Sequence, residues 1–184
     1  MKETTLKKKR KRLIFRSVLL TVMAGLVVFA LLSSHKQDKE VIAKGEKAPD
    51  FMLKEFGSDG KSISLSDLKG KGVMVNFWAT YCPPCKEEMP AFEEVYPEYK
   101  AKGVEFLAVN LDSTDLVVQK FVNKYNLSFP ILNDQKGQVM DLYNVDNLPS
   151  TLFINEDGEI VDQVIGELSK SQLETNLNKI TPED

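Results

Sequence analysis

Two cysteines separated by two prolines, Cys82-Pro83-Pro84-Cys85, constrain this chain more than any other feature. An apolar run over residues 73–79 precedes them and has the length and composition of a buried strand. Pro83 and Pro84 suit the first turn of a helix, where backbone N–H groups have no partner within the helix. The sequence therefore predicts that a strand delivers both sulfurs to the N-terminus of a helix.

This predicted position gives the two sulfurs different roles. Unsatisfied backbone N–H groups and the positive end of the helix dipole stabilise a thiolate over a thiol at a helix N-terminus. Cys82 lies at the cap and is therefore expected to attack a substrate disulfide. Cys85 lies one turn deeper and is expected to resolve the mixed disulfide that forms.

Four interpretations of the cysteine pair compete. A structural zinc site usually needs four ligands, and the other candidate ligand is His35, far upstream. A c-type haem attachment needs His directly after the second cysteine, where Lys86 stands. A structural disulfide would close a loop so small that it restricts the unfolded chain little. We predict a redox-active pair with no metal or further cofactor, and the structural disulfide stays open as the alternative.

The segment from Asn76 through Cys82-Pro83-Pro84-Cys85 to Pro90, with Leu148-Pro149-Ser150-Thr151 downstream, resembles the thioredoxin superfamily. The Glu-x-Pro after the helix start favours its membrane-tethered, extracytoplasmic branch, which is typified by ResA, CcmG and TlpA. The resemblance covers about residues 46–180. It implies a thioredoxin-like fold and thiol-disulfide exchange.

The resemblance also implies a substrate groove. The family's proline that matches Pro149 is cis and packs against the active-site disulfide, and the backbone beside it pairs with the substrate as an added strand. Leu148 and Pro149 are therefore expected in this groove, although the residues alone leave an ordinary trans proline open. Trp78 and Tyr81 flank the cysteines and are expected at the rim, with core packing open for Trp78.

Glu88 is the expected proton acceptor for Cys85, because the two residues share one helix face. A carboxylate whose pKa is raised by burial could take the thiol proton. Thioredoxins use a buried Asp of the central strand, and the matching residue here is Asn76, which cannot titrate. The alternative is an ordinary early-helix carboxylate, the role assigned to Glu87. The branch can also carry a Glu after the next strand, for which Asp112 would be an imperfect substitute.

The first third of the chain has the organisation of a membrane anchor. Residues 1–12 form a basic tail, and residues 13–32 form an apolar run, interrupted by Arg16, about long enough to cross a bilayer as a helix. The basic cluster predicts a cytoplasmic N-terminus. A cleavable signal peptide is the alternative, although no A-x-A motif follows the run. We expect a single-pass signal-anchor in the cell membrane, followed by a linker over residues 33–47.

Charge divides the chain into two parts. Residues 1–16 carry eight Lys or Arg and one Glu, so the remainder carries a net charge of −10, given −3 overall. An acidic outer domain argues against nucleic acid as a partner. Both cysteines lie in this domain, where oxidising conditions would keep them as a disulfide unless electrons are supplied.

Residues 48–184 are predicted to form one α/β domain. The strands are expected over residues 50–56, 61–65, 73–79, 104–111, 130–132, 151–155 and 159–165, and helical segments over 66–69, 114–125 and 136–143. Gly57-Ser58-Asp59-Gly60 and Glu156-Asp157-Gly158 are turn signals for two hairpins, the first an N-terminal addition. Ser169 to Gln172 is a capping box for the last helix. This order predicts a mixed central sheet with helices on both faces.

Two helices carry further expectations. Pro90 is expected to kink the redox helix, and Pro97 to end or restart it. In the helix over residues 114–125, one apolar face is expected from Leu116, Val117, Phe121 and Val122.

The chemistry predicts a thiol-disulfide oxidoreductase acting outside the cytoplasmic membrane. Neither proline has an N–H, so one donor that would stabilise the Cys82 thiolate at the helix start is missing, which predicts a reducing couple. The resemblance implies apocytochrome c as the substrate, whose CxxCH thiols are reduced before haem attachment. It also implies a CcdA-like membrane thiol reductant as the electron donor.

Three alternatives to this function stay open. A related reductant could serve spore-envelope or other exported proteins. A thiol peroxidase would share much of the fold. A membrane-tethered binding module with a structural disulfide would have no enzymatic activity.

Overall fold

The computed structural model describes residues 16–23, 25, 44–112 and 114–183 of the chain, which divides into the units Met1–Glu40 and Val41–Asp184. In the first unit residues 16–23 are helical. The predicted basic tail, most of the predicted anchor and most of the predicted linker lie outside the described residues. Within the described part of the chain, no helix combines the length and the hydropathy needed to cross a membrane.

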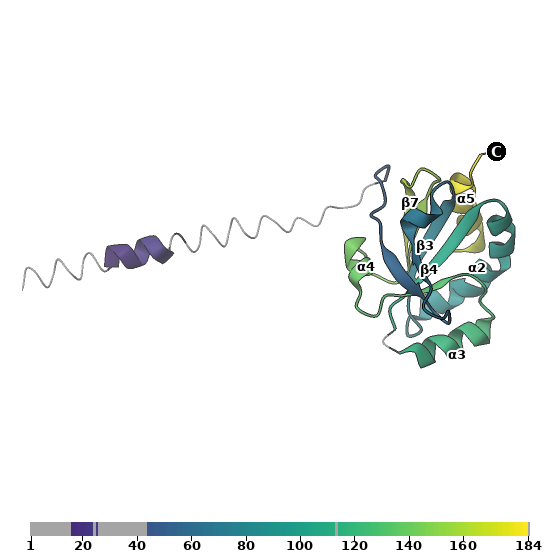
Figure 1. Ribbon diagram of the computed structural model, residues 1–184, viewed down its shortest axis with the longest axis horizontal. Helices are drawn as coiled ribbons and strands as arrows, with labels where there is room; N and C mark the ends of the chain where they lie inside the picture. Colours follow the sequence, from purple (N-terminus) through teal and green to yellow (C-terminus); the bar gives the residue numbers. More distant parts are fainter. Residues whose placement is uncertain (1–15, 24, 26–43, 113, 184) are drawn as a thin grey trace, which may run out of the picture. The chain divides into compact units, whose positions relative to one another are not determined.

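A seven-stranded mixed sheet organises the second unit, in the order β2-β1-β5-β4-β3-β6-β7 (Figure 1). Strands β3, β4 and β5 are parallel, and the other neighbours pair antiparallel. The strand bounds are β1 (Met52–Glu55), β2 (Ser62–Ser64), β3 (Gly72–Trp78), β4 (Val104–Asn110), β5 (Ile131–Asn133), β6 (Ser150–Ile154) and β7 (Ile160–Ile165). The predicted mixed sheet and both predicted hairpins are confirmed.

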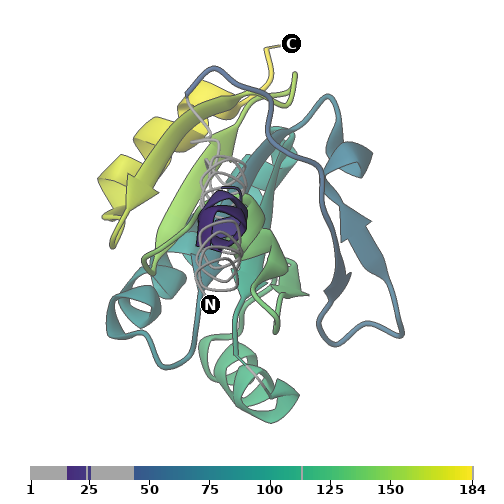
Figure 2. The same cartoon turned by 90° about the vertical axis from the view of Figure 1, so that its left-hand side faces the viewer.

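Helices cover both faces of this sheet, as predicted. The helical segments after residue 44 are η2 (Leu65–Leu68), α2 (Pro83–Ala101), α3 (Asp115–Tyr125), α4 (Gln138–Leu142) and α5 (Lys170–Ile180). Side chains of α2, α3 and α5 belong to one hydrophobic core, and those of α4 belong to the other. Figure 2 shows the β1/β2 hairpin at the edge of the sheet opposite β7 and α5.

The central strand β3 supplies both cores, because alternate side chains of a strand point to opposite faces. Met74 and Trp78 lie in the core with α2, whereas Val75 and Phe77 lie in the core with α4. All seven residues of β3 are buried. Asn76 follows the alternation and faces α2, which places a buried amide beneath the redox helix.

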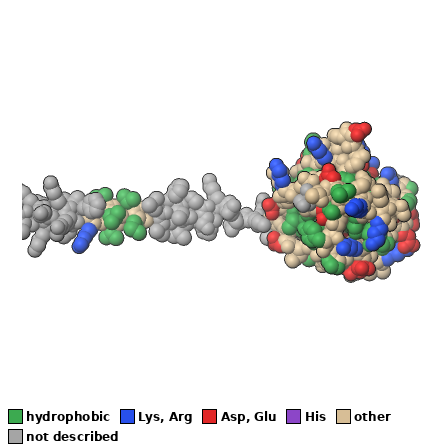
Figure 3. All heavy atoms as spheres, turned by 90° about the horizontal axis from the view of Figure 1, so that it is seen from below, with side chains coloured by type: hydrophobic (Ala, Val, Ile, Leu, Met, Phe, Trp, Pro, Cys, Tyr) green, Lys and Arg blue, Asp and Glu red, His purple; other side chains and the backbone are tan. Residues whose placement is uncertain are grey.

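The surface of the second unit mixes charges of both signs. Figure 3 shows Lys side chains interspersed with Asp, Glu and hydrophobic side chains on the face seen from below. A nucleic-acid interface would concentrate basic side chains into a patch or stripe. This face has no such concentration.

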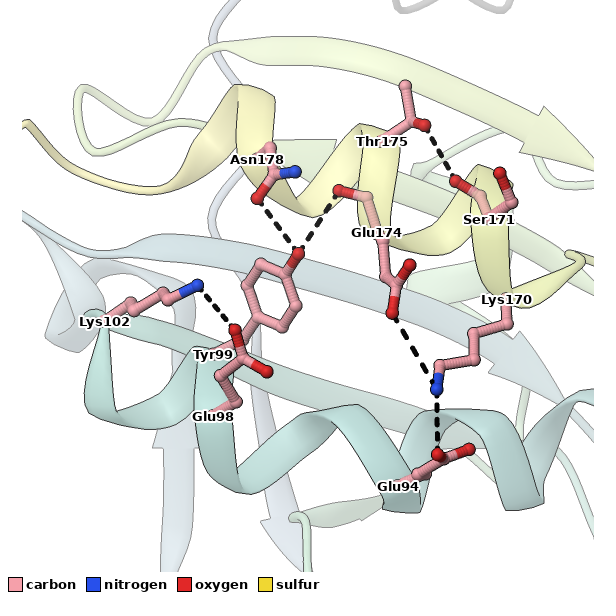
Figure 4. A network of polar contacts seen from close by, with 9 residues as sticks. All are labelled: Glu94, Glu98, Tyr99, Lys102, Lys170, Ser171, Glu174, Thr175 and Asn178. Carbon is pink, nitrogen blue, oxygen red and sulfur yellow. Dashed lines mark hydrogen bonds and ion pairs between the residues drawn. The ribbon is translucent and has the colours of Figure 1, made fainter.

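Helix α5 is joined to α2 by polar contacts at the surface (Figure 4). Lys170 Nζ lies 2.8 Å from Glu94 Oε1 and 3.9 Å from Glu174 Oε1. The Tyr99 hydroxyl donates to Asn178 Oδ1 at 2.9 Å. Exposed ion pairs add little to stability, so these contacts mainly fix orientation. The docking holds the loop between β7 and α5 against the buried face of α2.

The expectation that Pro97 ends the redox helix is wrong. Helix α2 continues to Ala101 with both Pro90 and Pro97 inside it. A proline within a helix costs about 3 kcal/mol, and the burial of Tyr96 and Tyr99 around this turn offsets that cost. A kink at Pro90 stays a prediction.

The apolar face expected for α3 is also partly wrong. Leu116 and Val117 are 64% and 40% exposed, whereas Val118 and Phe121 are buried. The reason is tertiary, because the Phe121 ring packs on the Trp78 ring with centroids 4.8 Å apart. This contact sets the rotation of the helix and leaves its first apolar residues facing solvent.

Candidate active site

The structure places the two cysteines at the predicted junction between a strand and a helix, where they form a disulfide. Cys82 is the N-cap of α2, and Pro83 and Pro84 are its first two residues. The backbone N–H of Cys85 donates to Cys82 Sγ at 3.3 Å. Because neither proline has an N–H, this is the first backbone donor that the helix offers to the sulfur.

The two sulfurs differ in their access to solvent. Cys82 keeps 7% of its surface exposed, whereas Cys85 is fully buried. A substrate disulfide that approaches from solvent meets the residue with exposed surface. The difference supports Cys82 as the attacking residue and Cys85 as the resolving residue.

The loop that leads to Cys82 is held by Asp112. One carboxylate oxygen of Asp112 accepts from the Thr80 backbone N–H, and the other accepts from the Thr80 hydroxyl, both at 2.7 Å. Asn110 Nδ2 also donates to this carboxylate, at 2.8 Å. These contacts occupy both oxygens of Asp112 with the loop, so the residue positions the chain ahead of Cys82.

Glu88 is a buried carboxylate one turn beyond Cys85, with 1% of its surface exposed. Its Oε1 accepts from Asn76 Nδ2 at 2.9 Å, and its Oε2 accepts from the Leu168 backbone N–H at 3.2 Å. Burial raises the pKa of Glu88 to about 7, opposed by these hydrogen bonds and assisted by the negative charge of Glu167.

The interpretation of Glu88 as an ordinary early-helix carboxylate therefore does not hold, because such a side chain would face solvent. The neighbouring Glu87 does face solvent, as expected. The two adjacent carboxylates thus have opposite environments on one helix.

Asn76 connects Glu88 to the neighbouring strand. Its Nδ2 also donates to Thr151 Oγ1 at 2.9 Å, and the two residues are in register between β3 and β6. The Oδ1 of Asn76 has no hydrogen-bond partner among the described residues.

Sequence reasoning missed Thr151 and Leu168. The predicted strand over residues 151–155 signals a neighbour for Asn76, but its register against β3 is not written in the sequence.

The Leu148–Pro149 peptide bond is cis, in agreement with the family resemblance, and the open alternative of a trans bond is wrong. Pro149 is buried and Leu148 is half-buried. The Pro149 carbonyl accepts from the Gly166 backbone N–H at 2.8 Å, which joins this turn to the end of β7.

The two aromatic residues expected at the groove rim lie in different environments. Tyr81 is 67% exposed, directly before Cys82, as a rim residue should be. Trp78 is fully buried and packs on Phe121, so its placement at the rim is corrected. The alternation of β3 directs Trp78 into the core that also holds Phe121 of α3.

Among the residues that the structure describes, no group of three or more His, Cys, Asp or Glu side chains could hold a metal ion. The chemistry available at the described site is that of two sulfurs and a buried carboxylate. This arrangement suits disulfide exchange coupled to proton transfer.

Comparison with known proteins identifies the family. Residues 44–163 match the model of the AhpC/TSA family. Thiol-disulfide oxidoreductase ResA of Oceanobacillus iheyensis is 50% identical over 179 residues, which cover 96% of this chain and 93% of that protein. The protein of the same name from Bacillus thuringiensis strain Al Hakam is 47% identical over 174 residues, which cover 95% and 99%.

Solved structures agree with these relatives. A DsbE-like thiol:disulfide interchange protein from Chlorobium tepidum aligns with a TM-score of 0.71 at 34% identity, covering 76% of this chain and 99% of that chain. StoA from Bacillus subtilis aligns with a TM-score of 0.60 at 34% identity, covering 69% and 95%. The chain therefore belongs to the AhpC/TSA family and is a thiol-disulfide oxidoreductase of the ResA type with a thioredoxin-like fold.

Proposed function

We propose that this enzyme reduces the CxxCH disulfide of apocytochrome c before haem attachment. In this proposal residues 13–32 anchor it in the cell membrane, the redox domain lies outside, and a CcdA-like membrane thiol reductant supplies the electrons. The observation that carries the proposed chemistry is the asymmetric site: Cys82 with some exposed surface, Cys85 fully buried, and the buried carboxylate of Glu88 one turn further. The ResA-like branch that the sequence resembles implies the substrate.

The reaction begins with both cysteines reduced. The Cys82 thiolate attacks one sulfur of the substrate disulfide, so that a mixed disulfide forms, the substrate S–S bond breaks and the other substrate sulfur leaves as a thiolate. Cys85 then attacks Cys82 Sγ, which restores the Cys82–Cys85 disulfide seen in the structure and releases the second substrate sulfur. The substrate gains two electrons and the enzyme loses two.

The cap geometry supports the reducing direction. The Cys85 N–H lies 3.3 Å from Cys82 Sγ and can donate to the thiolate, but Pro83 and Pro84 have no N–H to add a second donor. A thiolate with fewer donors is less stabilised, so the dithiol form gives up electrons more readily. The pair is therefore suited to reduce a partner.

Glu88 supports the second step. Cys85 must lose its proton before it attacks, and the carboxylate lies on the same helix face one turn further. Because burial raises the pKa of Glu88 to about 7, the group changes protonation state near neutral pH. That is the range in which a proton acceptor works most efficiently.

The proposed docking surface consists of Tyr81, Leu148 and Pro149. The ring of Tyr81 is exposed beside Cys82, and the half-buried Leu148 precedes the cis peptide bond. An extended substrate segment that pairs with this backbone would bring its disulfide to Cys82 without many side-chain contacts. Such a mode suits an apocytochrome, which is unfolded before haem attachment.

The test of the proposal is substrate trapping. The full-length Cys85→Ala variant lacks the resolving sulfur, so its mixed disulfide through Cys82 should accumulate in cells and be separable under non-reducing conditions. Mass spectrometry of the trapped species should identify a protein with a CxxCH motif. A double variant, Cys82→Ala with Cys85→Ala, is the matched control and should trap nothing.

Other results would redirect the proposal. A trapped partner without CxxCH would identify a different exported substrate. Cys82-dependent consumption of peroxide would indicate a peroxidase. Partner binding that persists in the double variant would indicate a tethered binding module.

The proposed anchor needs a separate measurement. The full chain should stay with membranes after alkaline extraction, and a reporter that is active only outside the membrane should be active when fused after residue 47. Release of the chain by alkali would contradict the anchor without affecting the trapping result.

A further inference from the structure

In the buried side-chain amide of Asn76, the NH₂ group makes hydrogen bonds and the carbonyl oxygen makes none among the described residues. Its Nδ2 donates to Glu88 Oε1 and to Thr151 Oγ1, both at 2.9 Å, while its Oδ1 has no partner among the described residues. An ionised carboxylate can only accept hydrogen bonds, so an amide that faces it must present the NH₂ group. The observed orientation is therefore the one that ionised Glu88 requires.

Protonation of Glu88 reverses this requirement. Oε2 already accepts from the Leu168 backbone N–H at 3.2 Å, so the proton belongs on Oε1, the oxygen that faces Asn76. A protonated Oε1 would meet the NH₂ group donor against donor, which is unfavourable in a buried site. A half-turn of the amide presents Oδ1 instead, with almost the same shape, and Oδ1 accepts from the carboxyl O–H.

Thr151 can serve as the partner in both orientations. A hydroxyl accepts from the NH₂ group in the first orientation and donates to Oδ1 in the second. Asn76 and Thr151 face each other in register on β3 and β6, so their backbones stay fixed while the amide turns. The two orientations thus keep the same two partners and reverse the direction of each hydrogen bond, and the NH₂ group of the second orientation takes the place that Oδ1 holds in the first.

We propose that Asn76 is a positioning residue whose side-chain amide turns over whenever Glu88 gains or loses a proton, and that Thr151 is a hydrogen-bond partner of the amide in both orientations. The inference rests on the proposed role of Glu88 as the proton acceptor of Cys85. The amide matches its hydrogen bonds to each protonation state of the carboxylate, so that neither state is left with opposed donors.

The resolving step then balances. The S–H bond of Cys85 breaks and its proton passes to Glu88 Oε1. The electron pair left on Cys85 Sγ forms the bond to Cys82 Sγ, the bond between Cys82 and the substrate breaks, and the substrate sulfur leaves with that electron pair. When the pair is reduced again, Glu88 returns its proton to the Cys85 thiolate, which restores the Cys85 thiol and the ionised carboxylate.

The groups that face Glu88 come from four elements. Helix α2 contributes Cys85, β3 contributes the uncharged Asn76, which donates to Glu88, and β6 contributes the uncharged Thr151, which accepts from Asn76. The loop between β7 and α5 contributes the Leu168 N–H and the exposed carboxylate of Glu167, whose charge acts on Glu88. The Glu167→Gln variant is therefore a matched control, because it changes the charge near Glu88 and keeps the amide contact.

The direct test is nuclear magnetic resonance on the full-length reduced protein in detergent micelles. Between pH 5 and pH 9, the Glu88 carboxyl carbon should titrate, and Overhauser contacts from the Asn76 NH₂ group to the Thr151 side chain should be strong at high pH and lost at low pH. In Glu167→Gln both signals should move together to a lower midpoint.

If Glu88 titrates while the contacts from the Asn76 NH₂ group persist at every pH, the amide does not turn and the inference fails. The trapping result with Cys85→Ala would be untouched by that failure. If Glu88 does not titrate in this range, the amide has no trigger and the inference also fails.

Variants give a kinetic readout that a merely structural role would not move. Asn76→Leu removes a charge-assisted hydrogen bond from the ionised carboxylate and a weaker neutral one from the protonated carboxyl, so the midpoint of the pH profile for the resolving step should rise by about one unit. Thr151→Val should raise the midpoint by less. It leaves one N–H of Asn76 unpaired when Glu88 is ionised, but only one lone pair of Asn76 Oδ1 unused when Glu88 is protonated. Thr151→Ser keeps the hydroxyl and should restore the wild-type midpoint. Lower stability with an unmoved midpoint would overturn the inference.

Discussion

The two faces of the central sheet are built from the same strands and bury different chemistry. On the face beneath α4, Phe77 and Leu152 belong to a cluster of apolar side chains. On the face beneath α2, the adjacent strand positions Asn76 and Thr151 are polar, and the Asn76 amide donates both to the carboxylate of Glu88 and to Thr151. A shift of one position along β3 or β6 therefore changes an apolar core into a proton-transfer site.

This difference separates stability from reactivity. Apolar burial stabilises the fold at every pH, whereas a buried carboxylate is costly when it is ionised. The face beneath α2 retains this costly carboxylate because its pKa of about 7 allows it to accept a proton near neutral pH. Substitutions on the two faces should accordingly produce opposite patterns of damage.

The largest effect is expected at the attacking sulfur. Cys82→Ser should lower the rate of reduction of a peptide with a CxxCH disulfide by at least about a thousandfold, because a hydroxyl is a far poorer nucleophile than a thiolate. Its midpoint of urea unfolding should stay close to that of the reduced wild type. Residual turnover at the wild-type rate would exclude this pair as the reaction centre.

The apolar face should show the reverse pattern. Phe77 is fully buried, with its ring centroid 5.8 Å from that of Tyr143, so Phe77→Ala should destabilise the fold by about 3–5 kcal/mol. The fraction that remains folded should reduce disulfides at the wild-type rate. Urea unfolding and rates normalised to folded protein would measure both, and a rate loss in the folded fraction would show that the two faces are coupled.

Glu88→Gln should change pH dependence on the reactive face. The folded pKa of about 7 lies above the ordinary value of 4.5, so the folded protein binds an extra proton between these values and loses stability as pH rises through them. The loss amounts to about 3 kcal/mol. The variant should lack it, and its resolving step should be slower by about a hundredfold, with no rise in rate near pH 7.

Urea unfolding at pH 5 and pH 8 measures this effect, with the exposed Glu87→Gln as the matched control. An equal pH dependence in Glu88→Gln and wild type would mean that Glu88 does not titrate in this window.

A smaller effect is expected in the loop before Cys82. Thr80→Val removes the hydroxyl that donates to Asp112 and leaves the backbone contact in place, so it should cost about 1 kcal/mol. The rate of reduction should fall a few-fold, because the sulfur is held less firmly. Unchanged stability and rate would indicate that the backbone contact to Asp112 positions the loop alone.

The smallest effect on stability is expected at the rim. Tyr81 is exposed, so Tyr81→Ala should change the free energy of unfolding by no more than about 0.5 kcal/mol. If the ring contacts the substrate, KM for the peptide should rise while kcat stays constant. A fall in kcat alone would place Tyr81 in the chemical step.

Local signals account for the parts of the fold that the sequence predicted well. Pro83 and Pro84 fix the start of α2, the Ser169 capping box fixes the start of α5, and Gly158 closes the turn between β6 and β7. Each signal acts within a few residues, so it can be read without knowledge of the fold.

Packing between distant segments accounts for the errors. Pro97 lies inside α2 because burial around it outweighs a lost hydrogen bond, and Trp78 lies in the core because α3 covers it. Leu116 is exposed because the contact between Phe121 and Trp78 sets the rotation of α3. None of these contacts is encoded within a few residues of the side chain concerned.

The sequence by itself determined the cysteine pair, its place at a helix cap and the absence of donors from the two prolines between the sulfurs. Only the tertiary structure decided the state of Glu88. Its hydrogen-bond partners Asn76 and Leu168 come from two other elements, Thr151 on a third holds Asn76, and the packing of these elements removes the carboxylate from water. Burial of a titratable group is a property of all the elements around it, which is why a helix position alone could suggest the role of Glu88 but not establish its environment.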